Sequence, residues 1–332
     1  MEKYLITGFS GFVSRHFLDF LDTRETHASV LGIDMHDPTF DLHGYHRLTC
    51  SFERLDLLYD KRAQEVIYNF QPDYILHLAS YSSVMFSWKS PVLSFQNNTN
   101  IFLNLLEIVR ALDADVRILS IGSSEEYGNV SDKELPLRED QPLRPVSPYA
   151  VARVSQEMLS RVYVEGYGLD IVITRSFNHI GPGQNEIFVV SSFAKQLAEA
   201  SRNGWSKLAM RTGDLSIVRD FTDVRDVVKA YHLLLTKGRK GEVYNVCSGR
   251  GVSLSEILSM MSEKTGIELM QTTEPKLVRP SDNRAIVGSN QKILVEVGWK
   301  PEILLDTALD HILQDWRTRL GSAPNAAEWS AT

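Results

Sequence analysis

The chain has 332 residues, of which 43% are hydrophobic and 23% are charged, a composition typical of a folded globular protein. Its 35 basic and 42 acidic residues give a net charge of −7, which argues against nucleic acid or an anionic membrane as a partner. No apolar run reaches membrane-spanning length, the amino end lacks a signal-peptide pattern, and Cys50 and Cys247 lack metal-ligand spacing. We therefore expect a cytoplasmic protein without a metal site, built as one large or two closely joined domains.

The first half of the chain alternates short apolar runs with segments of helical period. Residues 11–23 form the first predicted helix, and the predicted strands are 3–7, 28–34, 73–79, 116–122 and 170–177. Short runs that are apolar throughout are typical of strands buried on both faces. Alternation of such strands with helices predicts an α/β fold with a doubly wound, parallel, Rossmann-type sheet. We assign residues 1–177 to this domain.

Beyond this domain the regular alternation weakens. A Gly-Pro-Gly turn at residues 181–183 is followed by three further predicted elements, a helix at 224–236, a strand at 242–246 and a helix at 253–266. We expect a smaller α/β substrate-binding lobe over 178–320, with a segment near 223–247 returning to the first domain. The small-residue tail 321–332 is expected to be poorly ordered. Because no flexible linker separates the two parts, a cleft between packed lobes is predicted.

A glycine-rich turn follows the first predicted strand. Gly8 and Gly11 permit a tight bend, and the helix N-terminus behind them offers its partial positive charge to a pyrophosphate. The third glycine that is usual in such turns is Ser14 here. Asp34 ends the second predicted strand, where a carboxylate holds the adenosine ribose hydroxyls and repels a 2′-phosphate. This order of elements predicts dinucleotide binding and favours NAD(H), with NADP(H) left open.

Two later segments carry groups suited to proton transfer. Ser147 and Pro148 are typical of a helix start, and Tyr149 and Arg153, four residues apart, share one face of that helix. A phenol normally titrates near pH ~10, so proton transfer at neutral pH requires a nearby cation. The hydroxyls and acids of residues 122–128 (GSSEEYG) follow a strand, and the carboxyl ends of parallel strands face the ligand crevice.

With these motifs in place, the chain resembles the extended short-chain dehydrogenase/reductase family, in its branch that acts on nucleotide-diphosphate sugars. The matching segments span nearly the whole chain: TGFSGF, HLAS, SSEEYG, SPYAVAR, RSFNHIGPGQ, RDFTDVRDV, YNVCSG, RPS and GWKP. Within that branch, the combination is similar to GDP-6-deoxy-4-keto-mannose reductases, with GDP-mannose 4,6-dehydratases as near relatives.

The resemblance implies an NAD(P)H-dependent oxidoreductase that reduces the C4 ketone of a nucleotide-diphospho-4-keto-6-deoxyhexose, with GDP-4-keto-6-deoxymannose expected. It implies a homodimer formed through the helices near Asn100 and Tyr149. Catalytic roles fall on Ser123, Glu125, Tyr149 and Arg153. The implied cofactor contacts are Gly8, Ser10, Gly11, Phe12, Asp34, Asp56, Leu57, Leu78, Ala79, Ser80, Tyr149 and Arg153. The implied substrate contacts are Ser82, Ser83, Ser124, Asn178, Arg219 and Arg279.

One residue departs from the family pattern, which is Tyr-x-x-x-Lys at the catalytic helix. Arg153 stands at the lysine position, and it keeps the charge but differs in bulk and hydrogen-bond geometry. We expect activity to survive, because Ser123, Glu125 and Tyr149 are all present. Three alternatives stay open: a 4,6-dehydratase with Glu125 as base, a 4-epimerase, and a non-catalytic binder of nucleotide sugars or dinucleotides.

Overall fold

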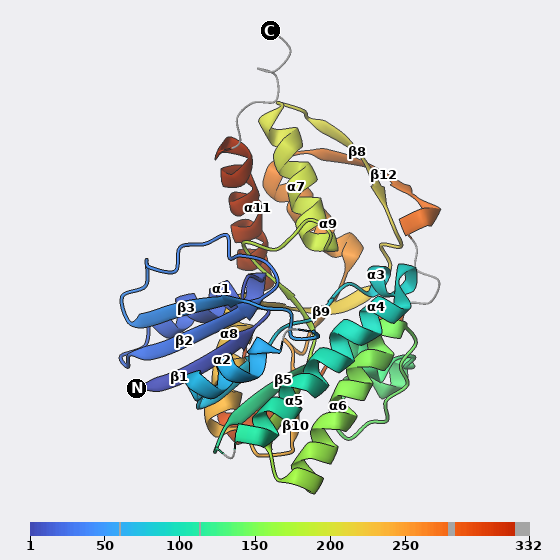
Figure 1. Ribbon diagram of the computed structural model, residues 1–332. Coiled ribbons are helices and arrows are strands. Elements are labelled where there is room, and N and C mark those ends of the chain that lie inside the picture. The colour runs from blue at the N-terminus through green and yellow to red at the C-terminus, as the bar shows by residue number, and fades with distance from the viewer. Residues whose placement is uncertain (60, 113, 278–282, 323–332) are drawn as a thin grey trace.

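The computed structural model describes residues 1–59, 61–112, 114–277 and 283–322. In Figure 1 a larger body with a central sheet lies below a smaller lobe, and α11 stands at the side of that lobe. Both parts contain helices and strands, so the structure confirms the predicted α/β class.

The body is built around a seven-stranded, wholly parallel sheet with the order β10-β6-β5-β4-β1-β2-β3. The strands are β1 (Glu2–Thr7), β2 (Ala28–Asp34), β3 (Leu48–Arg54), β4 (Tyr74–His77), β5 (Arg117–Ser123), β6 (Asp170–Ser176) and β10 (Val243–Val246). The predicted Rossmann-type sheet is thereby confirmed. β3 escaped prediction because it is an edge strand with several exposed polar residues, and it lacks the continuous apolar run of the central strands.

Helices cover both faces of this sheet. One face packs against α1 (Phe12–Asp22), α8 (Val224–Lys237) and α10 (Gln291–Val297). The other face packs against α2 (Arg62–Phe70), α5 (Ile101–Leu112) and α6 (Pro148–Tyr167). Two short helices, α3 (Val84–Lys89) and α4 (Pro91–Phe95), lie between β4 and α5 in the chain.

The smaller lobe has its own apolar core, formed mainly by three helices: α7 (Val189–Arg202), α9 (Leu254–Thr265) and α11 (Leu305–Ser322). A two-stranded parallel sheet joins β8 (Lys207–Thr212) to β12 (Glu268–Thr273). A four-stranded mixed sheet contains β7 (Asn178–Ile180), β9 (Val218–Asp223), β11 (Gly251–Ser253) and β13 (Ala285–Ile286). α11 continues to Ser322, so Gly321 and Ser322, which were predicted to belong to the tail, are helical. Residues 323–332 lie outside the described residues.

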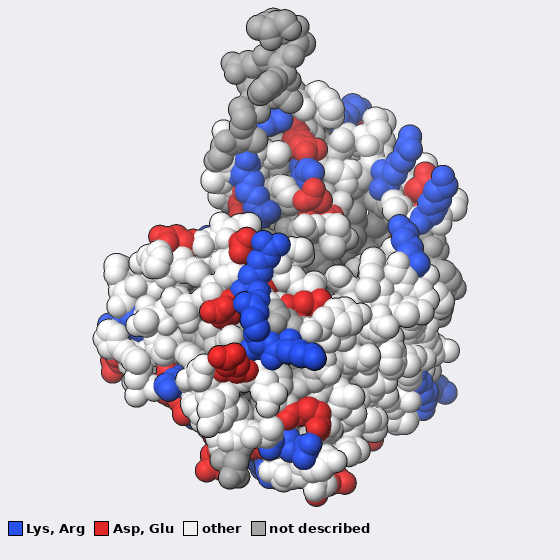
Figure 2. Space-filling view, viewed as in Figure 1, with Lys and Arg blue, Asp and Glu red and all other residues white. Residues whose placement is uncertain are grey.

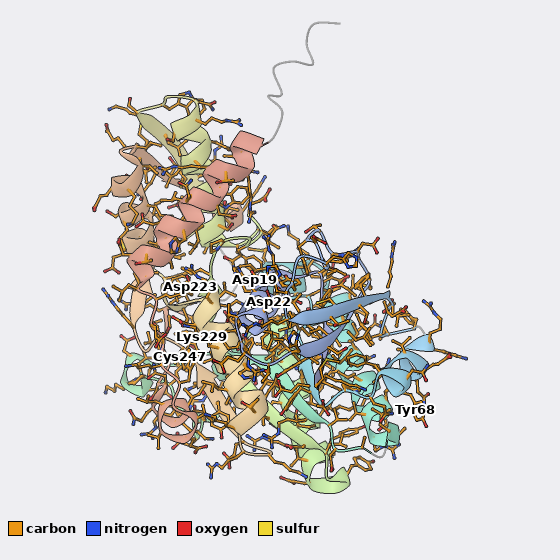
Figure 3. The ribbon with its side chains drawn as sticks, turned by 90° about the vertical axis from the view of Figure 1, so that its left-hand side faces the viewer. Asp19, Asp22, Tyr68, Asp223, Lys229 and Cys247 are labelled. Atoms are coloured by element: carbon orange, nitrogen blue, oxygen red, sulfur yellow. The ribbon has the colours of Figure 1, made fainter. Side chains whose placement is uncertain are left out.

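Three later segments return to the body: α8, β10 and the stretch from α10 to Trp299. This last return was not predicted from the sequence. Figure 3 places Asp223 at the start of α8 and Lys229 along that helix, below the smaller lobe. Between them, the fully buried Asp226 accepts hydrogen bonds from the backbone N–H groups of Glu302 and Ile303, at 2.8 and 2.7 Å. These bonds fix the chain that leads from the body into α11.

Candidate active site

A cleft of about 1450 Å³ lies between the body and the smaller lobe. Figure 2 shows the surface hollowed there, with lysine and arginine side chains at the edge of the hollow. The structure brings together around this cleft every predicted site residue that it describes: Gly8, Ser10, Gly11, Phe12, Asp34, Asp56, Leu57, Leu78, Ala79, Ser80, Ser82, Ser83, Ser123, Ser124, Glu125, Tyr149, Arg153, Asn178 and Arg219. Arg279 lies outside the described residues. The individual roles of these residues stay predictions.

The glycine turn at the end of β1 packs tightly against the backbone that follows β4. Gly8 adopts a φ of +71°, and a Cβ added there would lie 2.7 Å from the backbone nitrogen of Ala79. Gly11 is the N-cap of α1, whose first turn contains no acidic residue and receives no side-chain cap. Ser14 is fully buried and lines the cleft, and its hydroxyl has no hydrogen-bond partner among the described residues. These unpaired donors fit the pyrophosphate of a dinucleotide.

The end of β2 holds the carboxylate of Asp34 in a fixed position. Its two oxygens accept hydrogen bonds from the backbone N–H groups of Ser10 and His36, each at 3.0 Å. Asp37 also lines this part of the cleft and forms an ion pair with Arg54 at 3.4 Å. Asp34 and Asp37 therefore bring two carboxylates to the part of the cleft beyond β2, and Asp56 lines the same cleft. Asp37 was missed by sequence reasoning, because it lies beyond the strand end on which that reasoning concentrated.

Tyr149 and Ser123 reach the cleft from two different elements. Ser147 caps α6 by accepting a hydrogen bond from the N–H of Ala150 at 3.1 Å, which confirms the predicted helix start. Tyr149 follows in the first turn of α6, while Ser123 ends β5. Both side chains are largely buried, with 7% and 8% exposed. A hydroxyl pair of this kind is suited to a carbonyl or alcohol oxygen of a ligand.

Arg153 lies under the same part of the cleft. Its guanidinium carbon is 5.2 Å from the centroid of the Tyr149 ring, so the predicted shared helix face is confirmed. Nη1 donates to the backbone oxygen of Ile121 at 2.9 Å and to the side-chain oxygen of Gln156 at 2.7 Å. Nε is buried and has no hydrogen-bond partner among the described residues.

A buried carboxyl cluster supports Ser123 from behind, and sequence reasoning missed it. Oε1 of Glu126 accepts a hydrogen bond from the Ser123 N–H at 2.6 Å. Burial, followed by the charge of Glu157, raises the pKa of Glu126 to about 8. Burial opposes ionisation of Glu157 as well, but hydrogen bonds from Arg175 at 2.9 Å lower its pKa overall. Glu126 is therefore protonated at neutral pH beside an ionised Glu157.

The far end of the cleft belongs to the smaller lobe. Arg219 is 5% exposed, and its Nη1 donates to the backbone oxygens of Val218 and Asn283, each at 2.9 Å. Two further arginines, Arg211 and Arg284, line this end and were not predicted. Arg211 lies on β8, and no strand was predicted there because β8 is largely exposed and lacks an apolar run.

In the part of the chain that the structure describes, no group of three or more metal-ligating side chains is arranged to hold a metal ion. Within the same residues, none of the helices combines the length and apolar character that crossing a membrane requires.

Comparisons with known proteins agree with this geometry. Residues 5–312 match the family described as GDP-mannose 4,6 dehydratase. The chain is 32% identical to GDP-6-deoxy-D-mannose reductase of Pseudomonas aeruginosa, over 96% of this chain and 98% of that protein. The structure of RMD from the same organism, complexed with NADPH, superposes with a TM-score of 0.81 at 31% identity, covering 96% and 100% of the two chains. UDP-glucose 4-epimerase of Thermus thermophilus, in complex with NAD, superposes with a TM-score of 0.80 at 29% identity, covering 95% and 99%. The predicted nucleotide-sugar branch of the family is confirmed.

The glycine turn generates a first prediction. Gly8→Ala places a Cβ against the backbone at Ala79, so we expect binding of reduced nicotinamide cofactor to weaken at least about tenfold. Gly166→Ala is the matched control, since a Cβ there meets nothing within 4 Å. Cofactor fluorescence titration measures both. Equal cofactor affinities in the two variants would contradict the prediction that the cofactor binds close to the backbone of Gly8.

The carboxyl cluster generates a second prediction. In the folded protein Glu126 keeps its proton up to a pH of about 8, whereas in the unfolded chain it loses the proton above its usual pKa of 4.5. The stronger hold on the proton stabilises the folded protein fully below pH 4.5, and this stabilisation is lost as the pH rises towards 8. Glu126→Gln mimics the protonated form. We expect its free energy of unfolding, relative to wild type, to rise by about 2–4 kcal/mol between pH 5 and pH 8.5.

Urea denaturation at several pH values measures this difference. The exposed Glu165→Gln, on the same helix as Glu157, is the control and should follow the wild-type pH dependence. Parallel curves for Glu126→Gln and wild type would show that Glu126 is not protonated in the folded protein.

Proposed function

We propose a function for this chain on the premise that it belongs to the GDP-mannose 4,6-dehydratase family. The proposed activity is NAD(P)H-dependent reduction of the C4 ketone of a nucleotide-diphospho-4-keto-6-deoxyhexose. The observation that carries this proposal is the convergence of Ser123, Tyr149 and Arg153 on one cleft beside the glycine turn. The 32% identity to a GDP-6-deoxy-D-mannose reductase over nearly all of both chains supports the reaction class.

The cleft residues supply the proton that the C4 oxygen takes up, and they stabilise the negative charge that this transfer leaves on the donor. A reduced nicotinamide, when bound, supplies the hydride. The Tyr149 hydroxyl donates a proton to the C4 oxygen as the ketone becomes an alcohol, and the Ser123 hydroxyl donates a hydrogen bond to the same oxygen. The Arg153 charge, 5.2 Å from the Tyr149 ring, stabilises the negative charge that the departing proton leaves on the phenol.

We propose NADH as the preferred cofactor. A 2′-phosphate on the adenosine ribose would meet the carboxylates of Asp34 and Asp37. The related structures were solved with NADPH in one case and with NAD in the other, so the family alone does not decide.

We propose a GDP-linked sugar as the substrate, as for the reductase to which the chain is similar. The diphosphate fits Arg219, Arg211 and Arg284, because a guanidinium can donate two parallel hydrogen bonds to a phosphate. A 4,6-dehydratase is the second candidate. It is favoured by the family match and by Glu125, which lines the cleft next to Ser123 and offers a base for the sugar.

The assay that tests the proposal mixes the protein with GDP-4-keto-6-deoxymannose and either NADH or NADPH, and follows the loss of reduced-nicotinamide absorbance. We expect one cofactor consumed per sugar reduced, with a higher kcat/KM for NADH. Tyr149→Phe removes the proton donor and should lower kcat at least ~100-fold. The exposed Tyr59→Phe is its control. Conversion of GDP-mannose without net cofactor consumption would establish the dehydratase instead.

We also propose a cytoplasmic homodimer. Val151, Met158 and Val162 form one apolar stripe along α6, with 43%, 41% and 56% of each residue exposed. Unpaired Cys50 and Cys247 suit a reducing compartment. Light scattering should give twice the chain mass of 37.6 kDa for wild type and for Val295→Glu, and the single mass for Val162→Glu. A monomeric wild type would contradict the dimer.

A further inference from the structure

Arg153 is a buried cation that the protein balances without a carboxylate. Arg153 is 4% exposed, and its side chain forms no salt bridge within the described parts of the chain. The charged and titratable groups nearby do not offset its charge. Burial, together with the Arg153 charge, lowers the pKa of His77 to about 3, and burial raises the pKa of Tyr231. Since an unpaired buried charge is costly, hydrogen-bond acceptors must hold the guanidinium in place.

Gln156 supplies one of these acceptors, one turn further along α6. Its side-chain oxygen accepts from Nη1 of Arg153 at 2.7 Å. Its amide nitrogen donates to the Ser120 hydroxyl at 2.9 Å and to the Ile121 backbone oxygen at 3.2 Å. Ser160 donates to the Ser120 hydroxyl from the far side at 3.2 Å. Gln156 is 1% exposed, so bulk water does not compete for the hydrogen bonds of its side-chain amide.

This arrangement divides the guanidinium between two tasks. Nη1 is committed to the protein, because Ile121 and Gln156 both accept from it. Nε is buried without a hydrogen-bond partner, and Arg153 lines the cleft. A lysine has one nitrogen on a flexible stem, whereas the planar guanidinium can be anchored through one nitrogen and still present another donor in a fixed direction. Nη2 has no hydrogen-bond partner among the described residues, which leaves it available to a ligand in the cleft that Arg153 lines.

We propose that Gln156 is the positioning residue that anchors the Arg153 guanidinium beside Tyr149 and thereby presents its unpaired N–H to the bound nicotinamide cofactor. The proposal rests on the proposed function for the identity of the ligand. It explains how an arginine serves at this position, because the neighbouring turn of α6 provides an acceptor for the guanidinium. Gln156 acts only through Arg153, so its contribution to cofactor binding depends on which residue stands at position 153.

A double-mutant cycle tests this dependence. The variants are Gln156→Met, which keeps the side-chain volume and loses both polar ends, Arg153→Lys, and the two combined. Ser160→Ala is the matched control, since Ser160 contacts Ser120 and the Gln156 backbone but not Arg153. The primary measurement is the Kd for NADH and for NADPH by fluorescence titration. Thermal denaturation shows that each variant is folded, and Gln156→Leu replaces Gln156→Met if the latter does not fold.

We expect Gln156→Met to weaken cofactor binding about tenfold when Arg153 is present, as for a lost hydrogen bond to a charged group. In the Arg153→Lys background the same change should weaken binding less than about twofold, and Ser160→Ala should change it no more than that. Equal losses in both backgrounds, or an equal loss in Ser160→Ala, would overturn the proposal.

The same titrations separate this inference from the proposed function. Cofactor binding without ketone reduction would contradict the proposed reductase and leave the comparison of Gln156 variants standing. A wild-type protein that binds neither NADH nor NADPH would overturn both.

Discussion

The parallel pairing of β1 with its two neighbours places several of the candidate site residues at one edge of the sheet. Thr7 at the end of β1 lies level with Ile33 of β2 and His77 of β4, so the chain leaves all three strands at one edge of the sheet. The glycine turn, Asp34 and Ala79 follow from those three ends. β5 pairs with β4 in the same direction and carries Ser123 to that edge. The smaller lobe then closes the cleft, and α8, β10 and α10 tie it back to the body.

The second constraint is the buried charge of Arg153. A cation in this position is held by carbonyl and amide oxygens, and the same bonds that make its burial tolerable also fix its direction. Glu126 and Glu157 belong to a second buried charged cluster, in which two carboxyl groups share one negative charge next to Arg175. The N–H of Ser123 and Nη1 of Arg153 are therefore held by hydrogen bonds within the protein, while the side chains of Ser123 and Tyr149 line the cleft.

The sequence predicted those features of the site that are formed by residues close together in the chain. The glycine turn, the carboxylate at the end of β2 and the capped start of α6 each need only a few consecutive residues. Glu126 was out of reach because its partners Glu157 and Arg175 come from α6 and β6, and only tertiary packing joins them. Gln156 was missed for the same reason, since its role depends on the carbonyl of Ile121. The edge strand β3 and the exposed strand β8 gave no apolar run to detect.

Transfer of labelled hydride tests the central claim most directly. The protein is mixed with GDP-4-keto-6-deoxymannose and NADH that carries deuterium at the nicotinamide C4 position, and the product is examined by NMR and mass spectrometry. The account predicts one deuterium per sugar, bound at C4 of the deoxyhexose. A product without deuterium, or deuterium at another carbon, would contradict reduction of the C4 ketone by this site.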